Sequence, residues 1–389
     1  MSHSPARVGI IGGGQLGRML AMAAQRLDLR PVILDPQENA PAGPLSSHCI
    51  LGDYHDPERL AELARIATVS TFEIENIDPE PLLALEAQGH VLHPSPRLLA
   101  VLQDKLTQKQ TFKQHGIPTA DFIACDDPNV PDAAEIFAQF GYPLVQKARR
   151  GGYDGRGVAV LRNAADFPKR LNVPSVLERY VERQKELAVM AARGQDGHIQ
   201  CYPVVEMTFQ ETNTLDTLLA PARISEDIAD TARDLARRTV ETLDGVGVFG
   251  VELFLTHEGQ LLVNEVAPRT HNSGHYTIEA CYTDQFEQHL RAITGLPLGS
   301  TEQMRPAVMF NLLGEPGFQG APKVEGLEAA LAIPGVCVHL YGKTTTRPYR
   351  KMGHVTVLGD DLGTAQVKAA RVREMIRVRG SETDGAVEK

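Results

Sequence analysis

The sequence predicts a multidomain chain of α/β and α+β class, with a Rossmann-like N-terminal parallel sheet, a larger middle domain and a small β-rich C-terminal domain. Three observations support this prediction. Apolar strands alternate with helical patterns over the first hundred residues, whereas strand-like runs follow one another without helices from about residue 143. The chain of 389 residues is also long enough for two or three domains.

The N-terminal domain is expected to span residues 1–103. Its strands are predicted at residues 7–11, 32–34, 49–51, 69–72 and 91–93, and its helices at residues 16–27 and from Pro57 and Pro79 onward. Strands that alternate with helices predict a parallel sheet covered on both faces. The segment Pro94-Ser95-Pro96 is expected to end this domain.

The middle domain is expected to span residues 104–298 and to begin with a polar helix at residues 104–115. Its strands are predicted at residues 143–148, 158–161, 175–180, 187–191, 200–205, 249–255 and 261–266, and its longest helix at residues 225–243. Strands without intervening helices indicate an antiparallel sheet.

A third domain is expected at residues 299–378. Its strands are predicted at residues 307–312, 337–341 and 354–358, and its helix at residues 364–378. The polar residues 379–389 are expected to form a flexible tail.

The composition excludes several classes of protein. The formal net charge of −10 argues against nucleic acid or an anionic membrane as the main partner, so an anionic ligand needs local basic clusters. Five scattered cysteines exclude a disulfide framework and a zinc ribbon, and indicate a reducing compartment. Since no apolar run is long enough to span a bilayer and no signal peptide is visible, the expected location is cytoplasmic.

A glycine-rich turn follows the first predicted strand. Gly12, Gly14 and Gly17 fit the pattern G-x-G-x-x-G, and Asp35 ends the next strand, as in dinucleotide-binding folds. Such a turn can also bind another phosphorylated ligand or pack a helix closely against a sheet. An NAD-dependent dehydrogenase therefore remains an alternative, although it leaves the later motifs without a role.

The most concentrated signal lies at residues 147–157, where four glycines and four basic residues follow a strand. Glycine allows such a loop to fold over a triphosphate with its N–H groups inward. Lys147 would supply positive charge, and the arginines could add bidentate contacts to phosphate. A solvated hairpin turn is the alternative, but such turns rarely carry four basic residues in an acidic chain.

A predicted hairpin at residues 248–266 brings two acidic residues together. If Glu258 and Gly259 form a two-residue turn, Glu252 stands directly opposite Glu265 on one face. Two opposed carboxylates repel each other unless a cation such as Mg²⁺ compensates them. A solvated surface pair is the alternative, but the surrounding strands are mostly apolar.

Two polar segments follow this hairpin. Residues 269–275 offer guanidinium, imidazole and amide groups, a set suited to a small oxyanion, and they lack the carboxylate of a zinc-binding H-E-x-x-H motif. Residues 343–354 contain five basic side chains, counting histidine, and no acid. In an acidic chain this segment indicates a phosphate clamp, with a solvated edge as the alternative.

Taken in order, these motifs resemble the ATP-grasp superfamily and, within it, the N5-carboxyaminoimidazole ribonucleotide synthase family. The resemblance rests on GGGQLGRM at residues 12–19, LTQKQ at 106–110, GGYDGRG at 151–157, NEVAPRTHNSGH at 264–275 and RKMGH at 350–354. It implies an ATP-grasp middle domain and a purine-biosynthesis ligase. Such a ligase carboxylates 5-aminoimidazole ribonucleotide with ATP and bicarbonate, through carboxyphosphate, and releases ADP and phosphate.

The resemblance also implies roles for individual residues. ATP would be bound by Lys105, Lys147, Gly152, Tyr153, Asp154, Gly155, Arg156, Gly157, Glu178, Arg179, Tyr180, Val181, Glu186, Asn264 and Glu265. Mg²⁺ would be held by Glu252 and Glu265, whereas Ala267 stands where many relatives carry a further ligand, Asn. Bicarbonate would be bound by Arg269, His271 and Asn272. The ribonucleotide would be bound by Gln15, Leu16, Glu73, Tyr153, Asp154, Arg156, Lys343, Arg350 and Lys351.

The implied mechanism begins with attack of bicarbonate on the γ-phosphate of ATP, followed by carboxylation of the exocyclic amine, under a lid formed by residues 150–157. The family implies a homodimer through the N-terminal unit, with no nucleic acid or membrane partner. An ATP-grasp enzyme with another acceptor, such as a formate-using transformylase or a biotin carboxylase, remains an alternative. An inactive regulatory subunit is a third one, although the key residues of the motifs are intact, namely Lys147, Glu252, Glu265 and Arg269.

Overall fold

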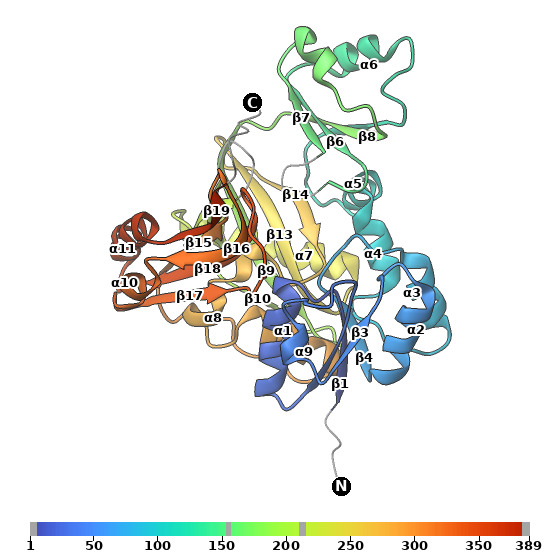
Figure 1. The fold of residues 1–389 in the computed structure, drawn as a ribbon. Coiled ribbons are helices and arrows are strands. Elements are labelled where there is room, and N and C mark those ends of the chain that lie inside the picture. Colours follow the sequence, from blue (N-terminus) through green and yellow to red (C-terminus); the bar gives the residue numbers. More distant parts are fainter. Residues whose placement is uncertain (1–5, 153–156, 210–214, 383–389) are drawn as a thin grey trace.

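The protein is described by a computed structural model, which covers residues 6–152, 157–209 and 215–382 (Figure 1). Its N-terminal part is a parallel sheet, as predicted, and the strand order is β3-β2-β1-β4. The elements are β1 (Arg7–Ile11), α1 (Gln15–Arg26), β2 (Arg30–Asp35), β3 (His48–Leu51), α2 (Pro57–Ile66), β4 (Val69–Phe72) and α3 (Pro79–Ala87). One face of the sheet packs against α1, and the other against α2 and α3.

Two details of the first hundred residues differ from the prediction. Residues 91–93 form no strand; only Leu92 makes an isolated bridge, to Ser70. Ser95 and Pro96, which were expected to end the domain, begin helix α4 (Pro96–Gln103), because the Ser95 hydroxyl accepts a hydrogen bond from the N–H of Leu98 and proline suits the first helical position. The predicted polar helix follows directly as α5 (Lys105–Gln114).

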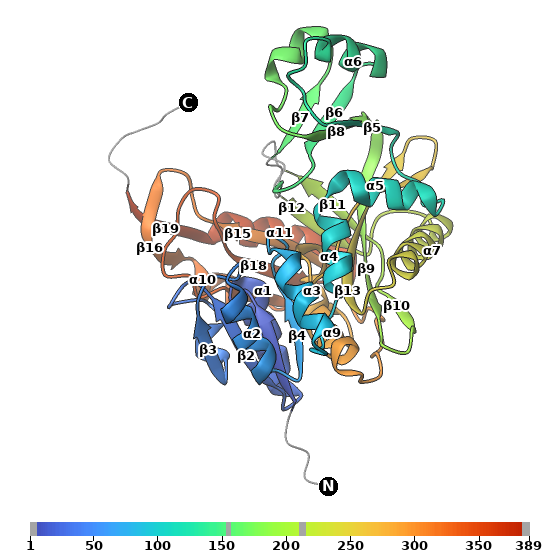
Figure 2. The same cartoon turned by 90° about the vertical axis from the view of Figure 1, so that its right-hand side faces the viewer.

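A small lobe projects from the body of the molecule (Figures 1 and 2). It is an antiparallel sheet of order β5-β8-β6-β7 with one helix packed on it. Its elements are β5 (Phe122–Cys125), α6 (Ala133–Phe140), β6 (Leu144–Ala148), β7 (Val158–Leu161) and β8 (Ser175–Arg179).

Nine of the described strands form one large sheet of order β14-β13-β9-β11-β12-β15-β18-β17, with β10 paired to β9. The middle part supplies β9 (Arg183–Arg193), β10 (Ile199–Cys201), β11 (Val205–Phe209), β12 (Leu215–Ala220), α7 (Glu226–Leu243), β13 (Gly247–Thr256), β14 (Leu261–Ala267), α8 (Thr277–Ala280) and α9 (Gln285–Thr294). Helix α7 packs on the β9, β13 and β14 end of the sheet. The strand predicted at residues 200–205 is two strands, β10 and β11, separated by Tyr202, Pro203 and Val204.

The C-terminal part extends the same sheet, because β15 pairs with β12 of the middle part. Its elements are β15 (Ala307–Leu313), β16 (Phe318–Glu325), α10 (Leu327–Leu331), β17 (Val336–Leu340), β18 (Lys351–Leu358), α11 (Leu362–Met375) and β19 (Arg377–Glu382). The predicted helix therefore ends at Met375, and the first residues of the predicted tail belong to β19, which pairs with β16. Residues 383–389 lie outside the described residues.

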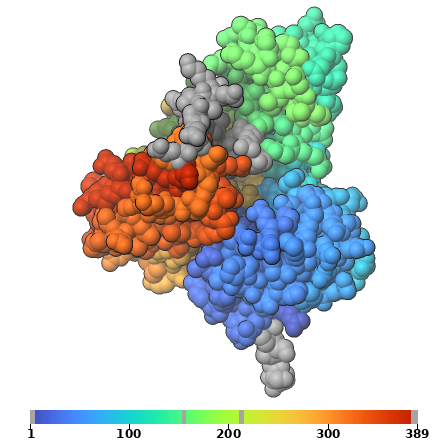
Figure 3. Space-filling model, viewed as in Figure 1, coloured from blue at the N-terminus to red at the C-terminus, as the bar shows by residue number. Residues whose placement is uncertain are grey.

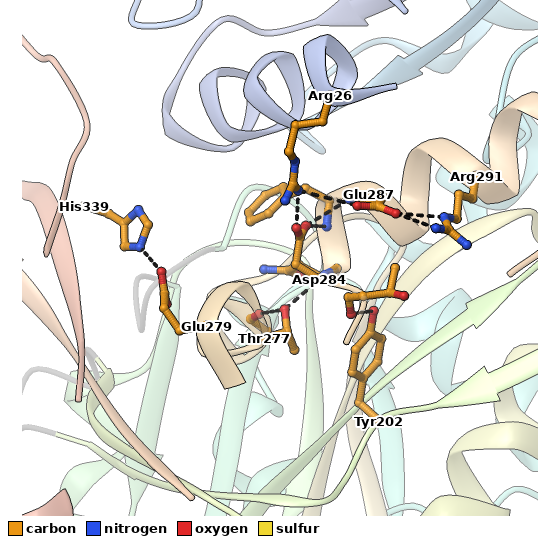
Figure 4. A network of polar contacts seen from close by, with 12 residues as sticks. Arg26, Tyr202, Thr277, Glu279, Asp284, Glu287, Arg291 and His339 are labelled. Carbon is orange, nitrogen blue, oxygen red and sulfur yellow. Dashed lines mark hydrogen bonds and ion pairs between the residues drawn. The ribbon is translucent and has the colours of Figure 1, made fainter. Parts of the chain in front are cut away.

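Polar contacts join the N-terminal and middle parts at α9 (Figure 4). Arg26 of α1 forms ion pairs with Asp284 and Glu287, and Arg291 binds Glu287 from the next turn. The N-terminal, lobe and C-terminal parts border a common hollow on the face shown in Figure 3. Within the described residues, no helix combines the length and the apolar character that crossing a membrane requires.

Candidate active site

The hairpin of β13 and β14 places two carboxylates opposite each other. Glu252 pairs directly with Glu265, as predicted. The predicted two-residue turn is wrong, however. Leu255 pairs with Leu261, so residues 257–259 form a three-residue turn, one of the next most common hairpin connections.

A bulge in β14 then restores the predicted pairing. The register shifts by one residue beside Glu252, which leaves Asn264 as an extra residue in β14. Because a bulge redirects side chains, both Asn264 and its neighbour Glu265 reach lysines. The Nζ atom of Lys147 lies 2.8 Å from Oδ1 of Asn264, and Nζ of Lys105 lies 2.5 Å from Oε2 of Glu265.

The two opposed carboxylates have different electrostatic surroundings. Lys105 lowers the pKa of Glu265 and outweighs the opposing effect of burial. Burial, followed by repulsion from Glu265 and Glu186, raises the pKa of Glu252. Oε1 of Glu252 lies 3.8 Å from Nε2 of His271, and its Oε2 accepts a long hydrogen bond of 3.5 Å from the side-chain amide of Asn264. These contacts and the charge of Lys105 do not outweigh burial and repulsion, so the charge of Glu252 is only partly compensated.

This arrangement fits Mg²⁺. Magnesium prefers oxygen ligands and is usually held by one or two carboxylates together with water and substrate phosphates. The described part of the chain contains no group of three or more His, Cys, Asp or Glu side chains that could hold a metal ion. The donor set of Glu252 and Glu265 therefore suits a metal shared with a phosphorylated substrate rather than a closed protein site.

A buried cluster of charges lies behind the hairpin. Glu178, near the end of β8, is only 2% exposed, and its Oε2 lies 3.0 Å from Nζ of Lys147 and 3.3 Å from Nζ of Lys109. Burial raises the pKa of Glu178, but the two ammonium groups outweigh it and hold the pKa below its ordinary value. Burial also lowers the pKa of Lys109 to about 8. Lys109 was not among the predicted site residues, although it belongs to the LTQKQ motif and lies one helical turn after Lys105.

The residues between β8 and β9 lie beside this cluster. Tyr180 and Val181 are half-buried, whereas Arg179 is exposed and its guanidinium lies over the ring of Phe140. Glu186 in β9 is bound by Arg183, with Nε 2.5 Å from Oε1. Any ligand hydroxyl bound by Glu186 would therefore share that carboxylate with an arginine.

The glycine-rich loop is described only at its ends. Gly152 and Gly157 flank residues outside the described ranges, which include the predicted Tyr153, Asp154, Gly155 and Arg156. The N–H of Ala148 donates to the carbonyl of Gly157 at 2.8 Å and closes the base of the loop.

The expectation that the loop arginines bind phosphate does not hold for Arg149. Its guanidinium donates to both carboxylate oxygens of Asp104, with NH2 2.6 Å from Oδ2, and NH1 lies 2.9 Å from Oδ1 of Asp126. Asp104 is also the N-cap of α5. This pair therefore fixes the loop base to the helix that carries Lys105.

Residues 269–272, here called the oxyanion loop, follow β14 directly. Arg269 forms an ion pair with Glu75 at 2.8 Å, and the backbone N–H and carbonyl of His271 both bind the side-chain amide of Gln285 at 2.8 Å. Among the described residues, Nε of Arg269 and both amide atoms of Asn272 are buried without a hydrogen-bond partner. Since buried polar groups are normally paired, the N–H groups of Arg269 and Asn272 are suited to donate to a bound oxyanion, and Oδ1 of Asn272 is suited to accept from a hydroxyl such as that of bicarbonate.

The first glycine-rich turn is occupied by the chain itself. The N–H of Gly13 donates to Asp35 and the N–H of Gly14 donates to Glu73, both at 2.7 Å. Two carboxylates therefore stand where a dinucleotide phosphate would need free N–H groups, which argues against the NAD alternative. At the start of α1, Gln15 is half-buried and the side chain of Leu16 is part of the core.

Residues 343–351, here called the cationic loop, lie close to this turn. Nζ of Lys343 donates to the carbonyl of Lys351 at 2.7 Å, and Arg350 donates to the carbonyl of Thr345 at 2.7 Å. Burial and then the charge of Arg350 lower the pKa of Lys343 to about 8, while the carboxylate of Glu73 opposes this shift. Residues that the sequence assigned to one ribonucleotide site thus come together from both ends of the chain.

Comparison with known families identifies each part of the fold. Residues 6–103 match the ribonucleotide synthetase preATP-grasp domain, residues 110–286 match the ATP-grasp domain, and residues 307–368 match the phosphoribosylaminoimidazole carboxylase C-terminal domain.

Individual proteins are similar over nearly the whole chain. The N5-carboxyaminoimidazole ribonucleotide synthase of Synechococcus elongatus is 43% identical over 355 residues, which cover 90% of this chain and 89% of that protein. The solved N5-carboxyaminoimidazole ribonucleotide synthetase of Thermotoga maritima has a TM-score of 0.89 and 47% identity, and the match covers 97% of this chain and all of that one. An Aspergillus clavatus enzyme solved with ADP and 5-aminoimidazole ribonucleotide has a TM-score of 0.87 and 34% identity, covering 95% and 98% of the two chains. The chain spans about two thirds of the relatives called phosphoribosylaminoimidazole carboxylase.

Proposed function

The chain belongs to the N5-carboxyaminoimidazole ribonucleotide synthase family of ATP-grasp ligases, and on that premise we propose how its residues carry out ATP-dependent carboxylation of 5-aminoimidazole ribonucleotide. One observation carries the proposal. The lysine–carboxylate cluster around Glu265 lies at the end of β14, and the oxyanion loop follows it a few residues later, where Nε of Arg269 and the side-chain amide of Asn272 are buried without a partner among the described residues. A phosphate-binding site and a small-anion site therefore lie side by side.

ATP binds with its phosphates against Lys105, Lys147 and Asn264 and beneath the loop that begins at Gly152. Two ammonium groups on one side of the hairpin supply the positive charge that a triphosphate requires. The adenine lies along Glu178 to Val181, and the ribose hydroxyls reach Glu186. This assignment is supported by the complexes of similar enzymes with ATP and ADP.

Glu252 and Glu265 would hold Mg²⁺, which supplies charge neutralisation on the phosphate oxygens when bound. Arg269, His271 and Asn272 bind bicarbonate. An oxygen of bicarbonate attacks the γ-phosphorus, the bond to the β-phosphate oxygen breaks, and ADP leaves carboxyphosphate behind. Arg269 and Lys147 stabilise the charge that develops during this transfer.

The ribonucleotide lies at the junction of the two ends of the chain. Lys343, Arg350 and Lys351 bind its phosphate, and Gln15, Leu16 and Glu73 contact the remainder together with the loop residues Tyr153, Asp154 and Arg156. The exocyclic amine forms a bond to the carboxyl carbon, phosphate departs, and the departing phosphate or His271 takes the amine proton.

The decisive test measures ADP release from Mg-ATP with bicarbonate and 5-aminoimidazole ribonucleotide added or omitted. We expect strong stimulation that needs both compounds and disappears in Glu265→Gln. Glu258→Gln, at the exposed turn of the same hairpin, is the matched control and should retain activity. A folded protein that binds ATP but shows no stimulation would exclude this acceptor and leave another ATP-grasp substrate.

Two further assignments complete the proposal. A reducing compartment such as the cytoplasm is supported by five cysteines that are all free thiols.

A homodimer through the N-terminal unit is supported by β3, an edge strand whose Leu51 is 56% exposed, and by Met22, which is 45% exposed. Sedimentation equilibrium of the protein and of Leu51→Lys tests the dimer.

A further inference from the structure

Three histidines form a stack between the oxyanion loop and the cationic loop. The ring of His354 in β18 lies 4.6 Å from the ring of His275 and 4.4 Å from the ring of His339 in β17, measured between centroids. The angle between the ring planes is 31° for the first pair and 13° for the second. His275 and His354 are almost completely buried, at 2% and 0% exposure.

Both ends of the stack are attached to the segment that carries the oxyanion loop. The side-chain amide of Gln285 lies 3.0 Å from Nδ1 of His275 and also donates to the carbonyl of His271. At the other end, Nε2 of His339 lies 2.6 Å from the carboxylate of Glu279 in α8, a contact visible in Figure 4. The stack is therefore anchored twice to residues 271–285.

The middle ring is attached to the strands that carry the cationic loop. Nδ1 of His354 lies 3.0 Å from the hydroxyl of Tyr341, and the Tyr341 ring lies under the ammonium of Lys343 at 5.6 Å. Lys351 begins the strand that contains His354. His354 thus lies three residues after Lys351 in the same strand. It is also hydrogen-bonded to Tyr341, whose ring lies under Lys343.

The surroundings of the His354 ring, the middle one of the three, favour a neutral, planar group. Nε2 of His354 is buried and receives no hydrogen bond from any described residue. A charged ring at this position would lie between two other imidazoles without a carboxylate in contact, so its desolvation would not be compensated. A flat neutral ring instead gains stacking contacts on both faces.

We infer that His275, His354 and His339 are positioning residues whose stacked rings hold the oxyanion loop and the cationic loop at a fixed separation. The inference rests on the proposed function, because these loops are the bicarbonate and ribonucleotide subsites. The ATP-binding lysines and carboxylates do not contact the stack. Loss of the stack should therefore impair the two small substrates and spare ATP.

The test compares His354→Leu, which removes the planar ring, with His354→Phe, which keeps it. We expect His354→Leu to lower kcat/KM for the ribonucleotide and for bicarbonate by roughly ten- to a hundredfold, the range expected for a misplacement of about 1 Å. The KM for ATP should stay within about twofold. His354→Phe should recover most of the loss although it lacks the hydrogen bond to Tyr341.

His289 provides the matched control. It is equally buried, but it bonds Thr71 and the N–H of Val248 at another junction of the fold. His289→Leu should lower the melting temperature without changing the ratio of the KM values. If His354→Leu does not fold, His339→Ala at the half-exposed end of the stack should show a smaller change of the same kind. Equal changes in all three KM values, or no change, would overturn the inference.

Hydrogen exchange gives a readout that does not depend on the identity of the substrates. Amides of residues 269–276 should exchange about tenfold faster in His354→Leu, and not in His289→Leu or His354→Phe. Unchanged exchange would overturn the positioning role even if the enzyme were active. Conversely, if His354→Leu exchanges faster but the wild type shows no ribonucleotide-stimulated ADP release, the proposed reaction is refuted and the positioning role stands.

Discussion

At the scale of single residues, Glu252 illustrates a conflict between stability and binding. Its pKa is raised by burial and by the carboxylates of Glu265 and Glu186. A carboxyl group with a raised pKa contributes stability that is complete below its ordinary pKa of 4.5 and is lost as the pH rises through the folded value. Glu252 therefore lowers the stability of the ligand-free protein near neutral pH.

We expect Glu252→Gln to raise the free energy of unfolding of the ligand-free protein by about 1 kcal/mol or more near pH 8 and by less near pH 5. The same change should abolish ADP release. Glu265→Gln is the control and should lower the free energy of unfolding. Lys105 lowers the pKa of Glu265, and the substitution removes this favourable ion pair. Urea unfolding at both pH values checks this; stabilisation by both variants, or by neither, would contradict it.

Lys109 shows which single residues the sequence does not reveal. The glycines, the lysine after a strand and the opposed glutamates were predicted because each belongs to a local pattern. Lys109 lies on helix α5 and acts through Glu178 on strand β8, so only the tertiary structure shows that Glu178 has two cations beside it. The pairing of Arg149 with Asp104 escaped the sequence analysis for the same reason.

At the scale of elements, the hairpin of β13 and β14 differs from the prediction in two ways, and the two differences cancel, so that the predicted pairing of Glu252 with Glu265 is still formed. The turn has one residue more than predicted, and the bulge at Asn264 adds one residue to β14. A period-two pattern can predict which residues share a face, but it does not give the length of a turn, and the break in alternation at Asn264 and Glu265 is visible as a bulge only once the pairing is known. The prediction of Glu252 opposite Glu265 was therefore confirmed, and its stated reason was not.

The three-residue turn can be distinguished from a two-residue turn by glycine substitution. A two-residue type I′ turn needs positive φ at both Glu258 and Gly259, whereas only Gly259 has it, at 82°. Glu258→Gly should therefore lower the free energy of unfolding by about 0.5–1 kcal/mol, because glycine loses more conformational freedom on folding. Gly259→Ala should cost about 1–2 kcal/mol through left-handed strain. Stabilisation by Glu258→Gly in urea unfolding would indicate the two-residue turn instead.

At the scale of the whole molecule, the fold class was predicted correctly, but the continuity of the large sheet was not. Local periodicity predicts β15, β17 and β18 as strands, yet it contains no information about their pairing with β12. That pairing joins the middle and C-terminal parts and brings the cationic loop to the N-terminal glycine turn. The convergence of these distant segments, which forms the ribonucleotide subsite of the proposal, was predicted only through the family resemblance.

The junctions between these parts also make the stability of the molecule depend on pH. His275, His289 and His354 are fully buried, and burial lowers the pKa of each below 6.5, to about 3 for His289. The groups facing them do not favour protonation: His275 faces His271, Lys351, His339 and Arg269, His354 faces the other two rings of the stack, and His289 faces His93. Their stabilising contribution is therefore complete above pH 6.5 and is lost as the pH falls toward the folded pKa values.

Glu252 titrates with the opposite sign over this range, because its pKa is raised, so the histidines are best measured in a Glu252→Gln background. There we expect the free energy of unfolding to fall below about pH 6.5, with a slope that approaches about 4 kcal/mol per pH unit when the unfolded chain binds three more protons. Carboxylates whose pKa values are lowered, such as Glu178 and Asp104, lose their contribution only below their ordinary pKa values of 4.5 and 3.8, so the two pH windows are separate. Urea titrations between about pH 7.5 and pH 5 measure the slope, and His354→Phe should reduce it by about one third. A flat profile over this range would show that the buried histidines take up protons in the folded state, and that their junctions tolerate the charge.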